Sequence, residues 1–468
     1  MFEPKWNRRD FLRTASGAVA ASVCSRAAGR RPNIVIVLAD DLGYADVGFQ
    51  GARDIPTPNL DRLAESGIRF SSGYVSHPFC SPTRAGLMTG RYQQRFGHEN
   101  NPKYDPGDAV SGLPVTETTI AQVLRDGGYA TGHIGKWHLG AAPHHHPLKR
   151  GFSESFGFLG GGHDYFKAQM TPDAKEYVIP IQRDGKPVEE KEYLTDAFSR
   201  EACAFVRRHA GDPFFLYLAY NAPHTPQQSS EKYLDRFAHI TDEKRKLCAA
   251  MTSAVDDGVG RLISTLRELK LESDTLLFFL SDNGGPLHDV NGTRNDPLRG
   301  AKGQVYEGGI RVPFIVRWPG QLAAGKTYKR PVISLDIFPT AAAAAGVSVA
   351  PALRAKLDGV NLLPHLQGKT SASPHERLFW RTGGGVLFAA RENRFKLVRI
   401  RGASPQLFDL DADIAESKDL AGERQDLVAK MNADIEAWNR QLIPPLFESP
   451  GAPVKKSLVS QGHHRIHV

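Results

Sequence analysis

The chain has 468 residues, 41% of them hydrophobic and 9% aromatic, so it can bury a large core and exceeds the length of one simple domain. Its formal net charge is +8, a mild basic excess that suits an anionic ligand. No basic stripe is interleaved with aromatic residues, which argues against nucleic-acid binding, and no apolar run reaches the roughly 18 residues of a membrane span.

The N-terminus has the pattern of an export signal. Two consecutive arginines, Arg8 and Arg9, precede a short apolar stretch that ends in small residues before Ala28. This order is typical of a removable export peptide, and the paired arginines are typical of the twin-arginine route, which carries folded proteins. We therefore predict that residues 1–28 are an export signal and that the mature protein is periplasmic or extracellular.

Four runs are predicted as strands, of which 33–39 is continuously apolar without the alternation of a half-buried strand, and segments with helical spacing separate them. The runs lie at 33–39, 129–134, 214–219 and 276–280. Runs of this kind are typical of strands covered on both faces in a parallel sheet. The alternation predicts an α/β fold with a mainly parallel central sheet flanked by helices. Each run ends in a polar cluster, and ligands bind at the carboxyl ends of such strands.

The pattern of the sequence changes near residue 373. Short apolar strands with turns between them lie at 379–381, 386–390, 395–398 and 406–410. Helical spacing follows over 427–442. The pattern predicts a small antiparallel sheet covered by one helix. We expect a catalytic domain over 29–372 and a C-terminal subdomain with a tail over 373–468.

Acidic and amide side chains follow the first and the last of the four runs. Asp40 and Asp41 follow the first, and Asp282 and Asn283 follow the last. Adjacent carboxylates repel one another unless a cation lies between them, and an all-oxygen set selects Ca²⁺ or, less readily, Mg²⁺. An Asp-Asp pair alone is typical of a capped turn. Because two strand ends supply these oxygens, we favour a metal site.

A cysteine precedes a predicted helix in the segment FCSPTRAGLMTGR at residues 79–91. Pro82 suits a first helical turn and Ser81 suits an N-cap, so we expect a helix from about Cys80 to Gly90. A helix N-terminus favours bound anions. The order Cys-x-Pro-x-Arg, with Leu-Met-Thr-Gly-Arg after it, resembles the signature of the type I sulfatases. In that family a formylglycine-generating enzyme oxidises the cysteine to formylglycine, a catalytic aldehyde.

Three further segments extend the resemblance over about residues 32–442. They are GKWHLG at 135–140, NAPH at 221–224, and the loop 298–303 with the YEGGIRVP that follows at 306–313. The resemblance implies the alkaline-phosphatase-like fold. It also implies that Ca²⁺ is bound by the following residues: Asp40, Asp41, Asp282, Asn283 and the modified Cys80.

The resemblance further implies a specific role for each basic side chain of the site. The hydrated aldehyde attacks sulfur, and Arg84 and the metal favour its ionised form. Lys136 and Lys302 bind the sulfate oxygens. His224 contacts the substrate and protonates the leaving alcohol as a general acid. His138 then accepts a proton, which expels sulfate and restores the aldehyde.

Other polar segments are candidates to line a substrate pocket. They are His98 to Asn101, His163-Asp164 and His288-Asp289. A Gly-rich excursion from Gly160 to Tyr193, with a hairpin at Asp184-Gly185, is expected to lie over the site.

The sequence thus predicts a sulfatase, and its substrate is suggested by analogy. The segment NGTR at 291–294 resembles members that act on sulfated galactose or N-acetylgalactosamine units, so we expect a sulfated carbohydrate. A phosphodiester or phosphonate monoester hydrolase on the same fold is the first alternative. A non-catalytic protein that binds sulfated glycans, with Cys80 unmodified, is the second. The complete set of site residues favours the sulfatase.

Overall fold

The computed structural model describes residues 30–171 and 175–448. The predicted export signal lies outside these residues. Within them, no helix combines the length and the apolar character that a bilayer crossing requires.

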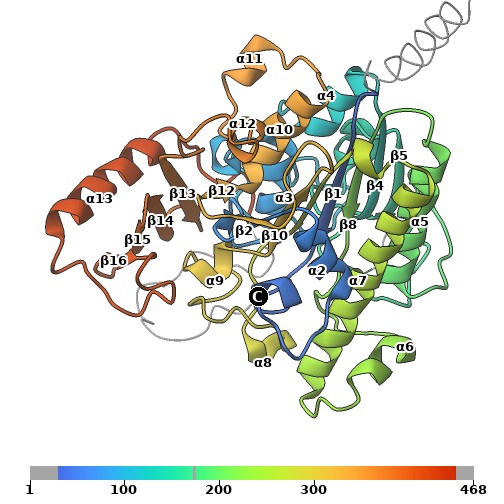
Figure 1. Ribbon diagram of the computed structural model, residues 1–468, viewed down its shortest axis with the longest axis horizontal. Helices are drawn as coiled ribbons and strands as arrows, with labels where there is room; N and C mark the ends of the chain where they lie inside the picture. Colours follow the sequence, from blue (N-terminus) through green and yellow to red (C-terminus); the bar gives the residue numbers. More distant parts are fainter. Residues whose placement is uncertain (1–29, 172–174, 449–468) are drawn as a thin grey trace, which may run out of the picture.

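A ten-stranded sheet forms the centre of the larger layer, in the order β11-β2-β10-β9-β1-β8-β4-β5-β6-β7 (Figure 1). Four neighbouring strands in its middle run parallel: β9 (Thr275–Ser281), β1 (Asn33–Ala39), β8 (Phe214–Ala219) and β4 (Ala130–Lys136). All residues of β9, β1 and β8 are buried. β5 (Glu154–Phe158) continues the parallel set beyond β4. The predicted parallel core is therefore confirmed, and the four predicted strands belong to it.

Shorter strands extend the sheet on both sides. They are β10 (Phe314–Arg317), β2 (Ile68–Phe70), β11 (Lys326–Tyr328), β5 (Glu154–Phe158), β6 (Gln182–Arg183) and β7 (Lys186–Pro187). β10 runs antiparallel to β9. β6 and β7 form the hairpin predicted at Asp184-Gly185, where both residues have positive φ. A separate pair joins β12 (Val332–Ile333) to β3 (Gly73–Tyr74).

Two groups of helices flank the sheet (Figure 1). One contains α2 (Pro58–Glu65), α5 (Leu194–Arg208) and α7 (Glu243–Glu268), which pack on one another. The other contains α3 (Cys80–Thr89), α4 (Ile120–Asp126) and α10 (Ile337–Ala344). Shorter helices lie in the connections: α6 (Glu231–Leu234), α8 (His288–Asn291), α9 (Glu307–Ile310), α11 (Pro351–Arg354) and α12 (Leu363–Leu366).

The C-terminal part forms the predicted antiparallel sheet. Its strands are β13 (Arg377–Thr382), β14 (Leu387–Glu392), β15 (Phe395–Ile400) and β16 (Gln406–Asp409), and α13 (Gln425–Asn439) covers it. The buried Lys396 Nζ lies 2.8 Å from Glu307 and 2.9 Å from Glu416. Because Glu307 begins α9, this buried ion cluster ties the small sheet to the larger layer.

The helix predicted at residue 80 is α3, and one detail of its prediction is wrong. Its N-cap is Phe79, not Ser81, because the helix already includes Cys80. The Ser81 hydroxyl donates to the His138 carbonyl oxygen at 2.5 Å instead of capping the helix. The helix ends as expected at Gly90, which has a left-handed φ of 66°. Cys80 therefore lies in the first turn of α3.

Candidate active site

The carboxyl ends of the four parallel strands meet at the first turn of α3. The structure brings the whole set of predicted site residues together there: Asp40, Asp41, Cys80, Arg84, Lys136, His138, His224, Asp282, Asn283 and Lys302. Seven of them are at most 2% exposed, whereas His138, His224 and Lys302 are 4%, 6% and 9% exposed. The site therefore reaches the surface on the side of these last three residues.

Asp40 is the carboxylate nearest to the cysteine. Its Oδ1 lies 3.5 Å from Cys80 Sγ, and its Oδ2 lies 2.5 Å from Lys136 Nζ. Burial raises the pKa of the Cys80 thiol far above its usual value, although Lys136 and Lys302 oppose this shift. The thiol is therefore protonated at neutral pH and is a poor nucleophile as it stands.

Asp41 binds the second lysine and the amide. It lies 2.9 Å from Lys302 Nζ, and it accepts a 2.7 Å hydrogen bond from Asn283 Nδ2. His224 Nε2 lies 3.7 Å away. Burial alone would raise the pKa of Asp41, but the charge of Lys302 and the hydrogen bonds from Lys302 and Asn283 lower it to about 2. Asp41 is therefore an anion at neutral pH.

Asp282 lies just after the end of β9 and faces Arg84, which belongs to α3. Arg84 donates to one Asp282 oxygen through Nη2 at 2.8 Å and through Nε at 3.1 Å, and its Nη1 donates to the Lys136 carbonyl at 3.1 Å. Burial and the nearby Asp40 carboxylate raise the pKa of Asp282 to about 6, against the opposing charge of Arg84. Arg84 thus holds the carboxylate and the end of β4 in place.

The donor set fits a hard divalent cation. Ligand atoms of Asp40, Asp41, Cys80 and His224 lie within 4.8 Å of one another. Asn283 Oδ1 is buried and has no hydrogen-bond partner among the described residues. Crowded carboxylates and an unpaired amide oxygen match the oxygen ligands that Ca²⁺ prefers.

His138 follows the end of β4 in a left-handed conformation. Its φ is 57°, and the preceding Trp137 is fully buried and donates its indole N–H to the His145 carbonyl at 2.9 Å. This turn satisfies the geometric condition for Lys136 and His138 to face the same site, namely that Trp137 points elsewhere. Burial lowers the pKa of His138 well below its usual value, and Lys136 lowers it further. The ring is therefore neutral.

His224 follows β8 and is held through its backbone. Tyr165 donates its hydroxyl toward the carbonyl oxygens of Asn221 at 2.6 Å and of His224 at 2.9 Å. Burial lowers the pKa of His224 to about 3, with help from Lys302 and against Asp41. Without bound ligand this ring is neutral at physiological pH.

Not all the candidate pocket residues reach the site. His98 is buried, and its Nε2 lies 2.6 Å from the Ser81 hydroxyl. His163 is also buried, with both ring nitrogens at backbone carbonyl oxygens, so its role is structural. His288 lies near the surface beside Asp242.

Asn295 holds the loop between Asn283 and Lys302, and its sequence position carries no pattern that would reveal it. Its Oδ1 accepts from the backbone N–H of Gly285 at 3.0 Å and of Tyr44 at 3.3 Å. Its Nδ2 donates to the carbonyl of Gly285 at 2.8 Å and of Gly300 at 3.4 Å. One amide thus ties together the segments that follow β1 and β9 and the segment that carries Lys302.

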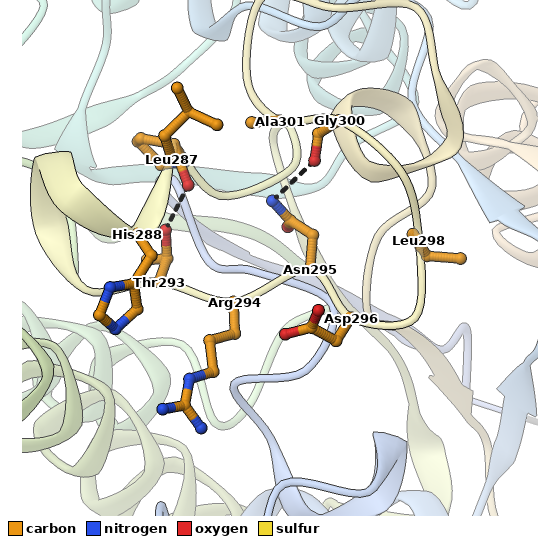
Figure 2. Close-up of a pocket in the computed structure, with 10 residues that line it drawn as sticks. Leu287, His288, Thr293, Arg294, Asn295, Asp296, Leu298, Gly300 and Ala301 are labelled. Atoms are coloured by element: carbon orange, nitrogen blue, oxygen red, sulfur yellow. Dashed lines mark hydrogen bonds between the residues drawn. The ribbon is translucent and has the colours of Figure 1, made fainter. Parts of the chain in front are cut away.

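The same loop encloses a cavity of about 360 Å³ (Figure 2). In Figure 2 the Asn295 side chain points toward Gly300, while Arg294 extends away from it. His288, a candidate pocket residue from the sequence, lines this cavity, but none of the ten residues gathered at the first turn of α3 does. It is therefore a neighbour of the site along the chain and not the site itself.

Comparison with known proteins agrees with this geometry. The model of the Sulfatase family matches residues 32–347, and the model described as N-sulphoglucosamine sulphohydrolase, C-terminal, matches residues 301–441. The chain is 36% identical over 400 residues to an N-acetylgalactosamine-6-sulfatase of Sus scrofa, covering 81% of this chain and 73% of that protein. It is 32% identical over 438 residues to the steryl-sulfatase of Homo sapiens, covering 75% and 72%.

A solved structure is similar over nearly the whole chain. The crystal structure of Ps i-CgsB in complex with k-i-k-neocarrahexaose has a TM-score of 0.85 and 42% sequence identity, covering 90% of this chain and 95% of that chain.

Replacing Asn295 with alanine is expected to lower both stability and activity. The buried N–H groups of Tyr44 and Gly285 would lose their acceptor, at a cost of about 1–3 kcal/mol for each unpaired group. Lys302 would lose its fixed position, and a displacement of about 1 Å can reduce turnover on the order of 100-fold. Thermal unfolding and hydrolysis of an aryl sulfate measure the two effects.

Asp289→Ala is the matched control, since Asp289 is an exposed residue of the same loop. It should behave as the unmodified protein does. An Asn295→Ala variant with unchanged turnover would show that other contacts hold Lys302.

Proposed function

This chain belongs to the sulfatase family and is a sulfuric ester hydrolase, and we propose that it desulfates carbohydrate through formylglycine made from Cys80 and a bound Ca²⁺. The surroundings of Cys80 carry the proposal. The residue lies in the first turn of α3, beside the Asp40 carboxylate, with Lys136 and Lys302 close enough to act on its charge.

The state of Cys80 explains why a modification is required. A buried thiol with a raised pKa does not supply a thiolate. As the hydrated aldehyde, residue 80 supplies a hydroxyl nucleophile that unmodified side chains do not provide. A formylglycine-generating enzyme is therefore a required partner during maturation.

Five residues would hold the metal: Asp40, Asp41, Asp282, Asn283 and the modified Cys80. Bound Ca²⁺ supplies positive charge beside residue 80, which favours the ionised hydroxyl. It would also neutralise the carboxylates that Lys136 and Lys302 contact here. The two lysines would then be available to bind sulfate oxygens.

Lys136 and Lys302 would clamp the sulfate from two sides. They come from the end of β4 and from the loop before α9, and both are buried. Fixed positive groups in a site shielded from water stabilise the charge that builds on the sulfate oxygens in the transition state. Arg84 would act by positioning, because its donors bind Asp282 and the Lys136 carbonyl.

The two histidines suit opposite proton transfers. His138 is neutral and can accept a proton when sulfate is expelled. His224 must be protonated to act on the leaving alcohol, and its low pKa has burial as its largest cause and Lys302 as the next. A bound sulfate ester brings negative charge beside Lys302, so it offsets part of this effect and raises the pKa of His224.

The relatives support a carbohydrate substrate. The names of two similar proteins specify N-acetylgalactosamine-6-sulfate hydrolysis and a bound neocarrahexaose, and the second shares 42% identity with this chain. We therefore propose sulfated galactose or N-acetylgalactosamine units. Residues 1–28 are proposed to direct export, which would place the enzyme outside the cytoplasm with such polymers, and 29–372 and 373–468 are proposed as its two domains.

Substrate profiling tests the proposal directly. The protein produced with a formylglycine-generating enzyme should hydrolyse sulfated galactosides and aryl sulfates, with kcat/KM at least about 100-fold above that for an aryl phosphodiester. Mass spectrometry should find the aldehyde at position 80, and Cys80→Ala should abolish turnover. Faster phosphodiester hydrolysis would favour the phosphodiesterase alternative. An unmodified thiol and no turnover would favour a glycan-binding protein.

Removal of calcium is expected to lower stability as well as activity. After treatment with a chelator, the buried carboxylates would lose the charge of Ca²⁺ and be compensated by Lys136, Lys302 and Arg84 alone, so Tm should fall. Added Ca²⁺ should restore Tm and raise it with concentration, by about 2.7 kcal/mol of stability at 100 times Kd. The Asp282→Asn variant should lose this response, whereas Asp289→Asn should keep it. A Tm indifferent to millimolar Ca²⁺ would contradict the metal assignment.

The proton supplied by His224 should matter most for a poor leaving group. In His224→Ala, kcat for a sugar sulfate should fall by about 10²–10⁴-fold. The loss should be far smaller for 4-nitrophenyl sulfate, whose leaving group needs no proton. His239→Ala, an exposed histidine, is the control. Equal losses on both substrates would show that His224 does not protonate the leaving group.

A further inference from the structure

The excursion between β5 and α5 brings two side chains to the open edge of the active site that no role above uses. They are Glu176 and Tyr177, which lie beside the glycines that follow β5. The bare backbone of Gly161 and Gly162 allows this approach, because side chains there would occupy the same space.

Glu176 faces His138 across Gly161. A Cβ built on Gly161 would lie 2.8 Å from His138 Nε2 and 3.3 Å from Glu176 Oε1. The carboxylate is half-buried, whereas His138 is one of the three residues on the side where the site reaches the surface. Glu176 therefore brings a carboxylate to the edge of the site where His138 reaches the surface.

Tyr177 lies beside Gly162 and is 45% exposed. A Cβ on Gly162 would lie 2.3 Å from Tyr177 Cε1. Burial raises the pKa of Tyr177, while the charges of Lys136 and Lys302 lower it, which agrees with a position near both lysines. An exposed aromatic ring thus lies beside the glycines at the edge of the site, within electrostatic reach of the two lysines proposed to bind sulfate.

The backbone fixes this pair to the part of the chain that holds His224. Asp164 donates its backbone N–H to the Tyr177 carbonyl at 2.6 Å, and Gln169 donates to the Val178 carbonyl at 2.7 Å. Tyr165, which follows Asp164 in the chain, donates its hydroxyl toward the carbonyl oxygens of Asn221 and His224. Glu176 and Tyr177 therefore have a defined place relative to the leaving-group side of the reaction.

An exposed aromatic ring beside a carboxylate is the chemistry that recognises a sugar. The C–H face of a pyranose packs on an aromatic ring, and its hydroxyl groups donate to a carboxylate in charge-assisted hydrogen bonds. A carboxylate would weaken binding of the sulfate itself, so its presence at this edge points to the neutral part of the substrate.

We propose that Glu176 and Tyr177 form the subsite for the sugar ring that carries the scissile sulfate, an inference that rests on the proposed function. The ring stacks on Tyr177, and one of its free hydroxyl groups donates to Glu176. The same carboxylate repels a second sulfate or a uronic acid carboxylate at that position. The pair thus selects a sugar with a free hydroxyl there.

Kinetics with three variants test the subsite: Tyr177→Ala, Tyr177→Phe and Glu176→Gln. In Tyr177→Ala, KM for a monosulfated galactoside should rise about tenfold or more, while competitive inhibition by inorganic sulfate stays unchanged. Tyr177→Phe keeps the ring and should restore most of the affinity. Thermal unfolding of each variant checks that the fold is intact.

Glu176→Gln should act on selectivity. Its kcat/KM for the monosulfated galactoside should fall about tenfold, and its discrimination against a disulfated galactoside should shrink by a similar factor. Glu189→Gln removes the same charge from an exposed position on the same excursion and should change neither value.

The outcomes separate the subsite from the function it depends on. If the variants hydrolyse sulfated galactosides as well as the parent enzyme does, the subsite is contradicted. The sulfatase proposal is then unaffected. A parent enzyme that hydrolyses aryl sulfate but no sugar sulfate would overturn the carbohydrate substrate and the subsite together. Loss of sulfate inhibition in Tyr177→Ala would show that the residue acts on the anion site instead.

Discussion

Three carboxylates crowd together at one edge of a buried sheet, and the rest of the site compensates their charge. Asp40, Asp41 and Asp282 are at most 2% exposed, and burial together with repulsion from Asp40 raises the pKa of Asp282. Buried charges persist only when they are paired, so each carboxylate has its own cation: Lys136, Lys302 and Arg84. Two of these cations, Lys136 and Lys302, are the side chains proposed to bind the sulfate ester.

The backbone is strained at two residues of the site, Asp41 and His138, and this strain directs their side chains. Asp41 and His138 have positive φ angles of 64° and 57°, although neither is glycine. Such conformations cost on the order of 1–3 kcal/mol each and persist only where surrounding contacts impose them. At Asp41 these contacts are Asn283 and Lys302, and at His138 the contact is the Ser81 hydroxyl on its carbonyl. Strain therefore lies in the residues that follow β1 and β4, where the chain must turn toward residue 80.

The parallel strands and the polar residues at their ends could both be predicted from the sequence, because each leaves a local pattern. Continuous apolar runs mark β1, β8 and β9, and charged clusters follow each. Asn295 could not be found this way, since its role depends on backbone groups of Tyr44 and Gly285 that only folding brings near it. The Ser81 cap was wrong for a related reason: a tertiary partner, the His138 carbonyl, takes the hydroxyl that local rules assign to the helix.

The burial of Cys80 also orders the events of maturation. At 1% exposure, beneath the carboxylates and lysines, its thiol is inaccessible to another protein in the folded state. An enzyme that oxidises it must therefore act on the unfolded chain. A twin-arginine signal, as predicted for residues 1–28, selects chains that have already folded. Modification must then precede folding, and folding must precede export. With the proposed modification and the predicted signal, the interior position of residue 80 would require its aldehyde to be made before export and before the site closes around it.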